Sequence, residues 1–120
     1  MKNWLFTAAI CGALGVAASA MAAHARDLSP MAETDIRLGA SYQLSHALAM
    51  GLAALAGRGR AKACATIAAS LFLAGIVLFS GGLYLRAFTG SFVFLIPFGG
   101  AAFIAGWIAL AITALKLEIL

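Results

Sequence analysis

The sequence predicts an all-α integral membrane protein: a four-helix bundle with short loops that forms a single transmembrane domain over residues 1–120. Hydrophobic residues make up 64% of the chain and charged residues only 10%, whereas soluble domains carry about 25% charged residues. The mean hydropathy is +1.04. Four apolar stretches, at about residues 4–23, 38–57, 64–85 and 92–115, approach or exceed the length of about 20 residues that crosses a bilayer as a helix. So few charges could not cover the surface of a soluble monomer.

The first stretch has two interpretations. It carries no charge from Asn3 to Ala23, and Gly12, Gly15 and Ser19 are spaced so that another helix can approach closely on one face. However, Lys2, the apolar run and the sequence Ala-Ser-Ala at 18–20 are also typical of a secretory signal peptide with its cleavage site. The two interpretations differ in whether the mature protein keeps this stretch.

The connection at residues 24–38 is the only markedly polar one. Ser29 followed by Pro30 is a typical helix start, with a capping hydroxyl and a proline at the first helical position. The charged residues of the connection are Arg26, Asp27, Glu33, Asp35 and Arg37. We expect a short interfacial helix here that merges into the second apolar stretch.

The second stretch carries a polar group at membrane depth. Tyr42, Ser45 and His46 share one face of a helix. Ionisable residues inside a membrane usually face protein or water, so we expect His46 to point into the bundle. Its ring nitrogens could then bond Tyr42 and Ser45, or Ser80 and Tyr84 from the third stretch.

The last two stretches each add irregular or polar features. Arg86 follows the third stretch and is expected to anchor at the membrane edge, in reach of lipid phosphates. In the fourth stretch, Pro97 and the pair Gly99-Gly100 permit a kink or a local break. Further along, Gly99, Ala102 and Gly106 form a second small-residue stripe for close helix packing.

Basic residues predict the orientation. The loop at residues 57–62 holds three positive charges and no negative one. With the N-terminus inside, five basic residues lie inside and three outside, which satisfies the positive-inside rule. Both termini are therefore predicted to be cytoplasmic. A reporter fused after the last residue, Leu120, that is active only outside the cytoplasm would contradict this prediction.

Alternating helix directions predict where the polar residues gather. Polar side chains lie at the end of the first and third stretches and at the start of the second, and the glycines and proline lie at the start of the fourth. The predicted intramembrane cluster comprises His24, Tyr42, Ser45, His46, Ser80, Tyr84 and Arg86. All belong to one half of the membrane, while the opposite half is apolar, with Trp107 as its one polar-tipped residue.

The cluster favours a structural role over a chemical one. A buried histidine beside hydroxyl groups is most often a hydrogen-bonded link between helices, worth about 0.6 kcal/mol; a proton path is the next interpretation. No acid lies in the four stretches, and two histidines alone make a poor metal site. No nucleophile has a base and an acid in a recognisable context. We therefore predict no enzyme activity, no metal and no cofactor, with Cys11 and Cys64 as packing residues.

Several blocks of sequence are similar to a known family. They are SAMAAH at 19–24, YQLSHALA at 42–49, LFSGGLY at 78–84, PFGG at 97–100 and GW at 106–107. In this order they resemble the YgdD-like family of small membrane proteins, known as domain of unknown function 423 and related to eukaryotic transmembrane protein 256. The family pattern before His24 has two glycines that are replaced here by Ser19 and Ala22. The resemblance implies an uncleaved first helix and a bacterial inner-membrane location, and supplies no activity.

Two main function classes follow. The first is a structural or interaction protein of the inner membrane, whose partners are the lipid bilayer and either a second copy or another membrane protein. The alternative is a small proton or ion conductor, or a subunit of one, that uses the polar cluster. Lipid handling through Arg86 is a weaker third hypothesis. Nucleic acid is not expected as a partner, because the basic residues stand singly beside apolar stretches as flanking charges.

Overall fold

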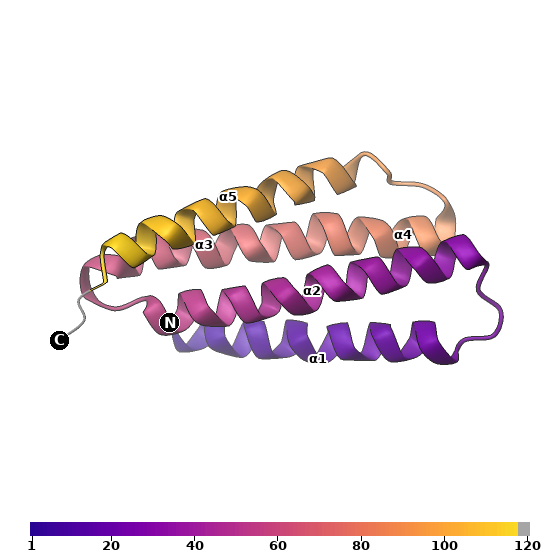
Figure 1. Cartoon of the computed structure of the whole chain (residues 1–120), viewed down its shortest axis with the longest axis horizontal. Helices are drawn as coiled ribbons and strands as arrows, with labels where there is room; N and C mark the ends of the chain where they lie inside the picture. Colours follow the sequence, from indigo (N-terminus) through magenta and orange to yellow (C-terminus); the bar gives the residue numbers. More distant parts are fainter. Residues whose placement is uncertain (118–120) are drawn as a thin grey trace.

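The computed structural model describes residues 1–117, which form four long helical rods and short loops (Figure 1). The first rod is α1 (Lys2–His24) and the second is α2 (Pro30–Ala56). The third rod runs without a break through α3 (Lys62–Gly75), the π-helix η2 (Ile76–Ser80) and α4 (Gly81–Thr89). The fourth is α5 (Leu95–Leu115), and a 3-10 turn, η1 (Gly59–Ala61), precedes the third. The prediction of an all-α membrane bundle is confirmed.

The rods alternate in direction and lie roughly in a row. α1 packs on α2, α2 on the third rod, and α5 on α3 and η2 (Figure 1). The Cα extents of 53 × 26 × 17 Å describe a long and flattened body. The Cα atoms of one helix lie on a cylinder about 5 Å across, so the shortest extent exceeds a single helix, and α5 also contacts α2. α2 and the third rod are thus the inner elements, and α1 and α5 are the outer ones.

Three helical segments are long and apolar enough to cross a membrane: Lys2–His24, Gly59–Thr89 and Leu95–Leu115. α2 is as long as these, with 27 residues, but its polar side chains lower its mean hydropathy. It lies alongside the others between α1 and the third rod (Figure 1). The chain is a four-helix membrane bundle in which one inner helix carries most of the buried polar groups.

The helices differ from the predicted bounds at their polar ends. α2 begins at Pro30, as the Ser29-Pro30 start predicted, and continues without a break into the stretch that begins at Leu38. The hydroxyl of Ser29 accepts a hydrogen bond from the Ala32 amide and caps the helix. The third rod continues past Leu85 to Thr89 and ends at Gly90, whose φ of 74° is a conformation that glycine adopts readily. The helices therefore extend into the polar residues that flank the apolar stretches.

Pro97 does not break the last helix. It lies in the first turn of α5, where backbone N–H groups have no partner within the helix in any case. The predicted kink or break at this position is wrong, because the helix begins only two residues earlier, at Leu95. The irregular backbone lies instead in η2, where five residues form a wider π-helical turn.

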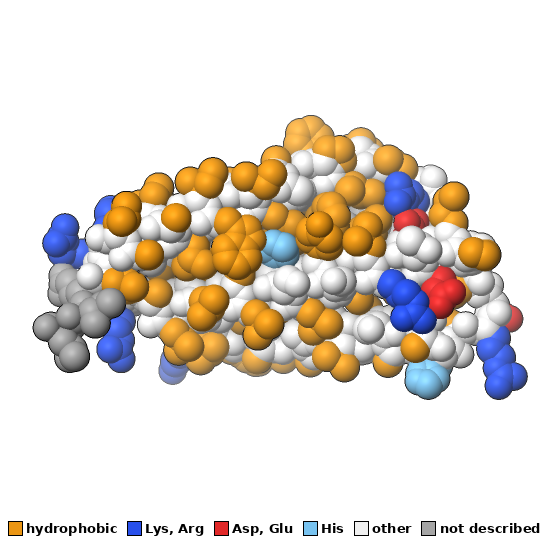
Figure 2. All heavy atoms as spheres, in the orientation of Figure 1, with side chains coloured by type: hydrophobic (Ala, Val, Ile, Leu, Met, Phe, Trp, Pro, Cys, Tyr) orange, Lys and Arg blue, Asp and Glu red, His pale blue; other side chains and the backbone are white. Residues whose placement is uncertain are grey.

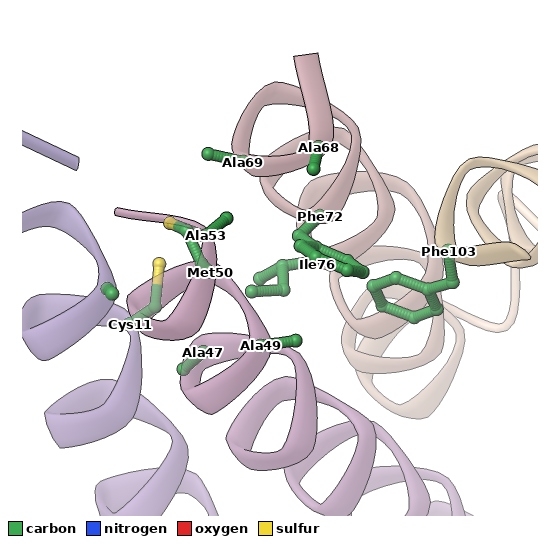
Figure 3. Packing of buried hydrophobic residues seen from close by; sticks show 11 residues of the cluster. Cys11, Ala47, Ala49, Met50, Ala53, Ala68, Ala69, Phe72, Ile76 and Phe103 are labelled. Atoms are coloured by element: carbon green, nitrogen blue, oxygen red, sulfur yellow. The ribbon is translucent and has the colours of Figure 1, made fainter. Parts of the chain in front are cut away.

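The apolar core lies between α2, α3 and α5. Phe72 and Phe103 lie against each other from α3 and α5, and Met50 of α2 faces Cys11 of α1 (Figure 3). Most of the other buried residues are alanines, such as Ala53 and Ala68, which are fully buried. Small side chains of this kind let helices approach closely in a membrane, where packing rather than water exclusion holds them together.

Charged side chains occupy the two ends of the bundle and leave its middle apolar (Figure 2). The end near the N-terminus shows only basic side chains on the visible face, whereas the other end shows basic and acidic side chains together. The basic end includes Lys2 and the loop with Arg58, Arg60 and Lys62. This division of charge matters for orientation and for lipid contacts.

A polar ladder along the second helix

One face of α2 carries a line of polar contacts, which we call the polar ladder. Its members on α2 are Asp35, Gly39, Gln43 and His46. Their spacing of four, four and three residues places them on one side of the helix. From Asp35 to His46 the ladder rises about 16 Å, which is roughly half of a hydrocarbon core of about 30 Å. It therefore runs from one end of the bundle to its middle.

The outer end of the ladder is an ion pair. The Arg86 guanidinium donates two hydrogen bonds to the Asp35 carboxylate, at 2.9 Å from Nε and 2.7 Å from the terminal nitrogen. Asp35 is only 4% exposed. Two parallel bonds of this kind are the strongest form of arginine–carboxylate contact. Asp35 therefore takes two of the Arg86 donors, and contact between Arg86 and lipid phosphate stays a prediction.

The middle of the ladder ties three helices together. The Tyr84 hydroxyl of α4 donates to Oε1 of Gln43 at 2.7 Å, and Nε2 of Gln43 donates to the Cys11 carbonyl of α1 at 2.8 Å. One rung nearer the outer end, the Ser80 hydroxyl donates to the Gly39 carbonyl at 2.7 Å. That bond uses a carbonyl of α2 and a side chain of the π-helix η2. A single glutamine thus couples α1, α2 and α4.

The inner end of the ladder is His46. Its Nδ1 lies 2.7 Å from the Tyr42 carbonyl, and its Nε2 lies 3.0 Å from Nε1 of Trp107 in α5. An indole N–H can only donate, so Nε2 is the acceptor and Nδ1 carries the proton. The imidazole is therefore neutral, with both nitrogens bonded. A second proton on Nε2 would point at the indole N–H and break the bond to Trp107.

Aromatic rings enclose His46 on its remaining sides. Its ring stacks on Phe103 with centroids 3.6 Å apart, and Phe72 lies at 5.8 Å. Tyr42 stacks on it from the preceding turn, at 5.8 Å. With the side chain only 6% exposed, little space remains for a ligand or for water beside the imidazole.

The structure divides the predicted cluster. Ser80 and Tyr84 belong to the ladder, although they bond Gly39 and Gln43 rather than His46. Tyr42 reaches His46 through its backbone carbonyl and its ring, and the Ser45 hydroxyl donates to the Ser41 carbonyl. Neither hydroxyl bonds His46, and both side chains are exposed.

His24 also lies apart from the ladder. It is the last residue of α1 and is exposed, at the end of the bundle. The glycine-to-alanine replacement beside it does not loosen the packing, because Ala22 is 1% exposed. A histidine at this position sits at the membrane edge rather than in the intramembrane cluster.

Four ladder residues were missing from the predicted site: Asp35, Gly39, Gln43 and Trp107. The prediction that the membrane helices contain no acid is wrong for α2, because that helix begins early enough to include Asp35. Trp107 was placed in the apolar half, yet it bonds His46 at mid-depth. The regular spacing of Asp35, Gln43 and His46 is the signal that could have found two of them, once the helix is started at Pro30.

The ladder stops at mid-membrane. Beyond His46 the buried residues of α2 are Ala47, Ala49, Met50, Ala53 and Ala54. Within residues 1–117, every buried side-chain nitrogen or oxygen has a hydrogen-bond partner. The same residues contain no group of three or more His, Cys, Asp or Glu side chains that could hold a metal. Within residues 1–117 the ladder is thus a connected set of bonds that leaves no buried side-chain nitrogen or oxygen without a partner.

Glycines set the distance between α5 and the third rod. A Cβ on Gly99 would overlap the backbone of Phe79, and a Cβ on Gly106 would lie 2.8 Å from the ring of Phe72. Both glycines are buried. By contrast, a Cβ on Gly100 would meet only the edge of the Phe79 ring, at 3.9 Å. Of the adjacent pair, one glycine is needed for packing and the other is not.

Residues 18–100 match the family described as "Protein of unknown function (DUF423)". The chain belongs to this family. A Haemophilus influenzae UPF0382 membrane protein is 40% identical over 97% of both chains, and Bacillus subtilis YwdK is 34% identical over 97% of this chain and 98% of its own. The Escherichia coli inner membrane protein YgdD is 36% identical over 95% of this chain and 90% of its own. No solved structure matches the chain.

The DUF423 relatives carry membrane-protein names and no enzymatic one. The resemblance inferred from the sequence blocks is thus confirmed. These relatives span nearly the whole chain, so α1 and α5 align along with the ladder. The family description assigns no function, so the role of this chain is inferred from the contacts between its helices.

Proposed function

We propose that this DUF423 protein is a structural or interaction protein of the bacterial inner membrane and not an enzyme. The observation that carries the proposal is the connected set of bonds in the polar ladder. Its bonds join α2 to α1, α4, η2 and α5, so it acts as a clamp between helices. Buried polar groups that are fully bonded fix one arrangement of packed helices, because each alternative leaves a donor or acceptor unpaired in hydrocarbon.

A proton or ion path finds less support. A proton relay through His46 needs a group on each side that can give and take a proton, and the next buried residues toward the basic end are alanine and methionine. The ring nitrogens of His46 are already bonded to a backbone carbonyl and to an indole. Neither partner carries protons at neutral pH.

The role of His46 can be tested by flux and stability together. We expect wild-type protein and His46→Ala to give the same proton flux in liposomes after a pH jump, no higher than empty liposomes. His46→Ala should also unfold at lower denaturant, by about 1 kcal/mol or more, since it removes the Trp107 bond and leaves a cavity beside Phe103. Ser45→Ala is the control, because its exposed hydroxyl lies outside the ladder. Flux in the wild type that His46→Ala abolishes would contradict the structural role.

An outward face of α2 supports an interaction role. Ser41, Tyr42 and Ser45 are exposed near the middle of the helix, and Tyr42 is 41% exposed. Within residues 1–117 the Tyr42 hydroxyl makes no hydrogen bond, and a hydroxyl in contact with hydrocarbon lacks the partners that water would give. Hydroxyl groups both donate and accept. A second copy of the chain, with the same face, could therefore bond the Tyr42 hydroxyl.

Disulfide crosslinking tests this face. In a background with Cys11→Ala and Cys64→Ala, we expect Tyr42→Cys to form a disulfide-linked dimer in native membranes under mild oxidation. Val16→Cys is the control, because Val16 is an exposed membrane-depth residue of α1, away from the proposed face. Equal crosslinking at both positions, or none at Tyr42→Cys, would argue against a self-interaction through this face.

The charge distribution supports an orientation with both termini in the cytoplasm. The basic end carries Lys2, Arg58, Arg60 and Lys62 and, within residues 1–117, no acid. The opposite end has three basic and three acidic residues, two pairs of which form ion pairs. The positive-inside rule favours the basic end as the cytoplasmic one, and the reporter fusion described above remains its test.

A further inference from the structure

A groove of about 660 Å³ runs along the outer side of the bundle between α1 and α2. Its lining is almost wholly apolar: Leu5, Ala8, Ala9, Gly12, Leu44, Ala47, Leu48, Gly51, Leu52 and Leu55. Small residues form its floor, and Leu48, Leu52 and Leu55 stand exposed along its rim. The volume lies within the range of about 300–1,000 Å³ that is usual for small-molecule sites. The groove is separate from the polar ladder, because none of Asp35, Gly39, Gln43 and His46 lines it.

The groove has the length of one leaflet. From Leu44 to Leu55 the helix rises about 16 Å, which is close to half of a hydrocarbon core of about 30 Å. Leu44 lies near mid-membrane, beside Gln43 of the ladder, and Leu55 is one residue from the end of α2. The groove therefore extends from the bilayer middle to the basic end of the bundle, as one acyl chain would.

Basic side chains stand at the open end of the groove. Lys2 precedes Leu5 by three residues and so shares its side of α1, and Arg58 follows directly after the cap of α2. Both side chains are exposed, and neither forms an ion pair within residues 1–117. Met1 packs against Gly57, which brings the start of α1 and the end of α2 together at this end. Cations at the headgroup level attract anionic lipids.

We infer that this groove binds one acyl chain of an anionic phospholipid, whose phosphate lies between Lys2 and Arg58. Two independent features select the occupant. The apolar length fits one leaflet's chain, and the charge at its mouth favours a negative headgroup over a zwitterionic one. This inference does not rest on the structural role proposed above, because it concerns the opposite side of α2 and the opposite end of the bundle.

Gly12 allows the groove to be filled without disturbing the fold. A Cβ at Gly12 would have no heavy atom within 4 Å, so Gly12→Leu extends a side chain into empty space. Ala101→Leu is the matched control, because it adds bulk at an exposed position of α5 outside the groove. For the headgroup, Lys2→Gln with Arg58→Gln removes the charge at the mouth, and Arg26→Gln removes one exposed charge at the other end.

Native mass spectrometry of the delipidated full chain, titrated with phosphatidylglycerol or phosphatidylcholine, tests the inference. We expect phosphatidylglycerol to bind more tightly, Gly12→Leu to abolish that binding, and the double charge variant to weaken it by about fivefold per charge removed. Ala101→Leu and Arg26→Gln should bind as the wild type does. The inference would be overturned by unchanged binding in Gly12→Leu or by equal binding of the two lipids. It would also be overturned if Gly12→Leu lost a protein dimer rather than a bound lipid.

Discussion

Arg86→Gln lowers the free energy of unfolding by about 3 kcal/mol, as expected from the loss of one partner of a buried ion pair. The Asp35 carboxylate would remain 4% exposed with neither of its two arginine hydrogen bonds. The value lies at the low end of the usual range because the Arg86 side chain is itself 34% exposed. Denaturant unfolding of the purified protein in detergent, at neutral pH, measures the change.

The ion pair of Arg37 and Glu33 is the matched control. It also joins an arginine to a carboxylate, here one helical turn apart, but its two side chains are 52% and 43% exposed. Arg37→Gln should therefore cost no more than about 0.5 kcal/mol. The double variant Asp35→Asn with Arg86→Gln should recover part of the loss, because no charge is then left buried. Equal losses in Arg86→Gln and Arg37→Gln would show that the buried pair is not a stability determinant.

The ladder explains why the sequence predicted the fold better than the site. Composition and the length of apolar stretches decide that the chain is a helical membrane bundle, because hydrocarbon leaves few other ways to satisfy a backbone. The ion pair depends on a helix boundary instead. Once Ser29 caps α2, Asp35 becomes an intramembrane residue on the same face as Gln43, and Arg86 is the donor one rod away. The sequence instead placed Asp35 in a short interfacial helix outside the apolar stretch.

Pairing across helices was harder to predict than position along a helix. His46 was expected to face the bundle, and it does, but its partners came from a backbone carbonyl and from Trp107. Trp107 was placed in the other half from the alternating helix directions. The π-helix has no simple sequence signal either, although Ser80 and Gly81-Gly82 mark its end. Such contacts depend on how rods rotate and slide against each other.

Two adjacent glycines of α5 should respond in opposite directions to the same change. We expect Gly99→Ala to destabilise the protein by about 1–3 kcal/mol, the usual cost of overpacking. The new methyl group would overlap the backbone of Phe79 in η2, and backbone cannot rotate away as a side chain can. Gly100→Ala should be neutral or stabilising by up to about 1 kcal/mol, because alanine is the better helix former and its methyl group finds ordinary contact at 3.9 Å.

The same unfolding assay compares the two variants, which differ by one position and share one chemical change. Helix propensity alone predicts that both alanines stabilise α5, whereas close approach of α5 to η2 predicts a loss at Gly99 only. Destabilisation at both positions, or at neither, would mean that Phe79 does not set the helix spacing. A loss confined to Gly99 would show that the π-helix brings its backbone against α5, and that the adjacent Ser80 reaches the ladder from the same turn.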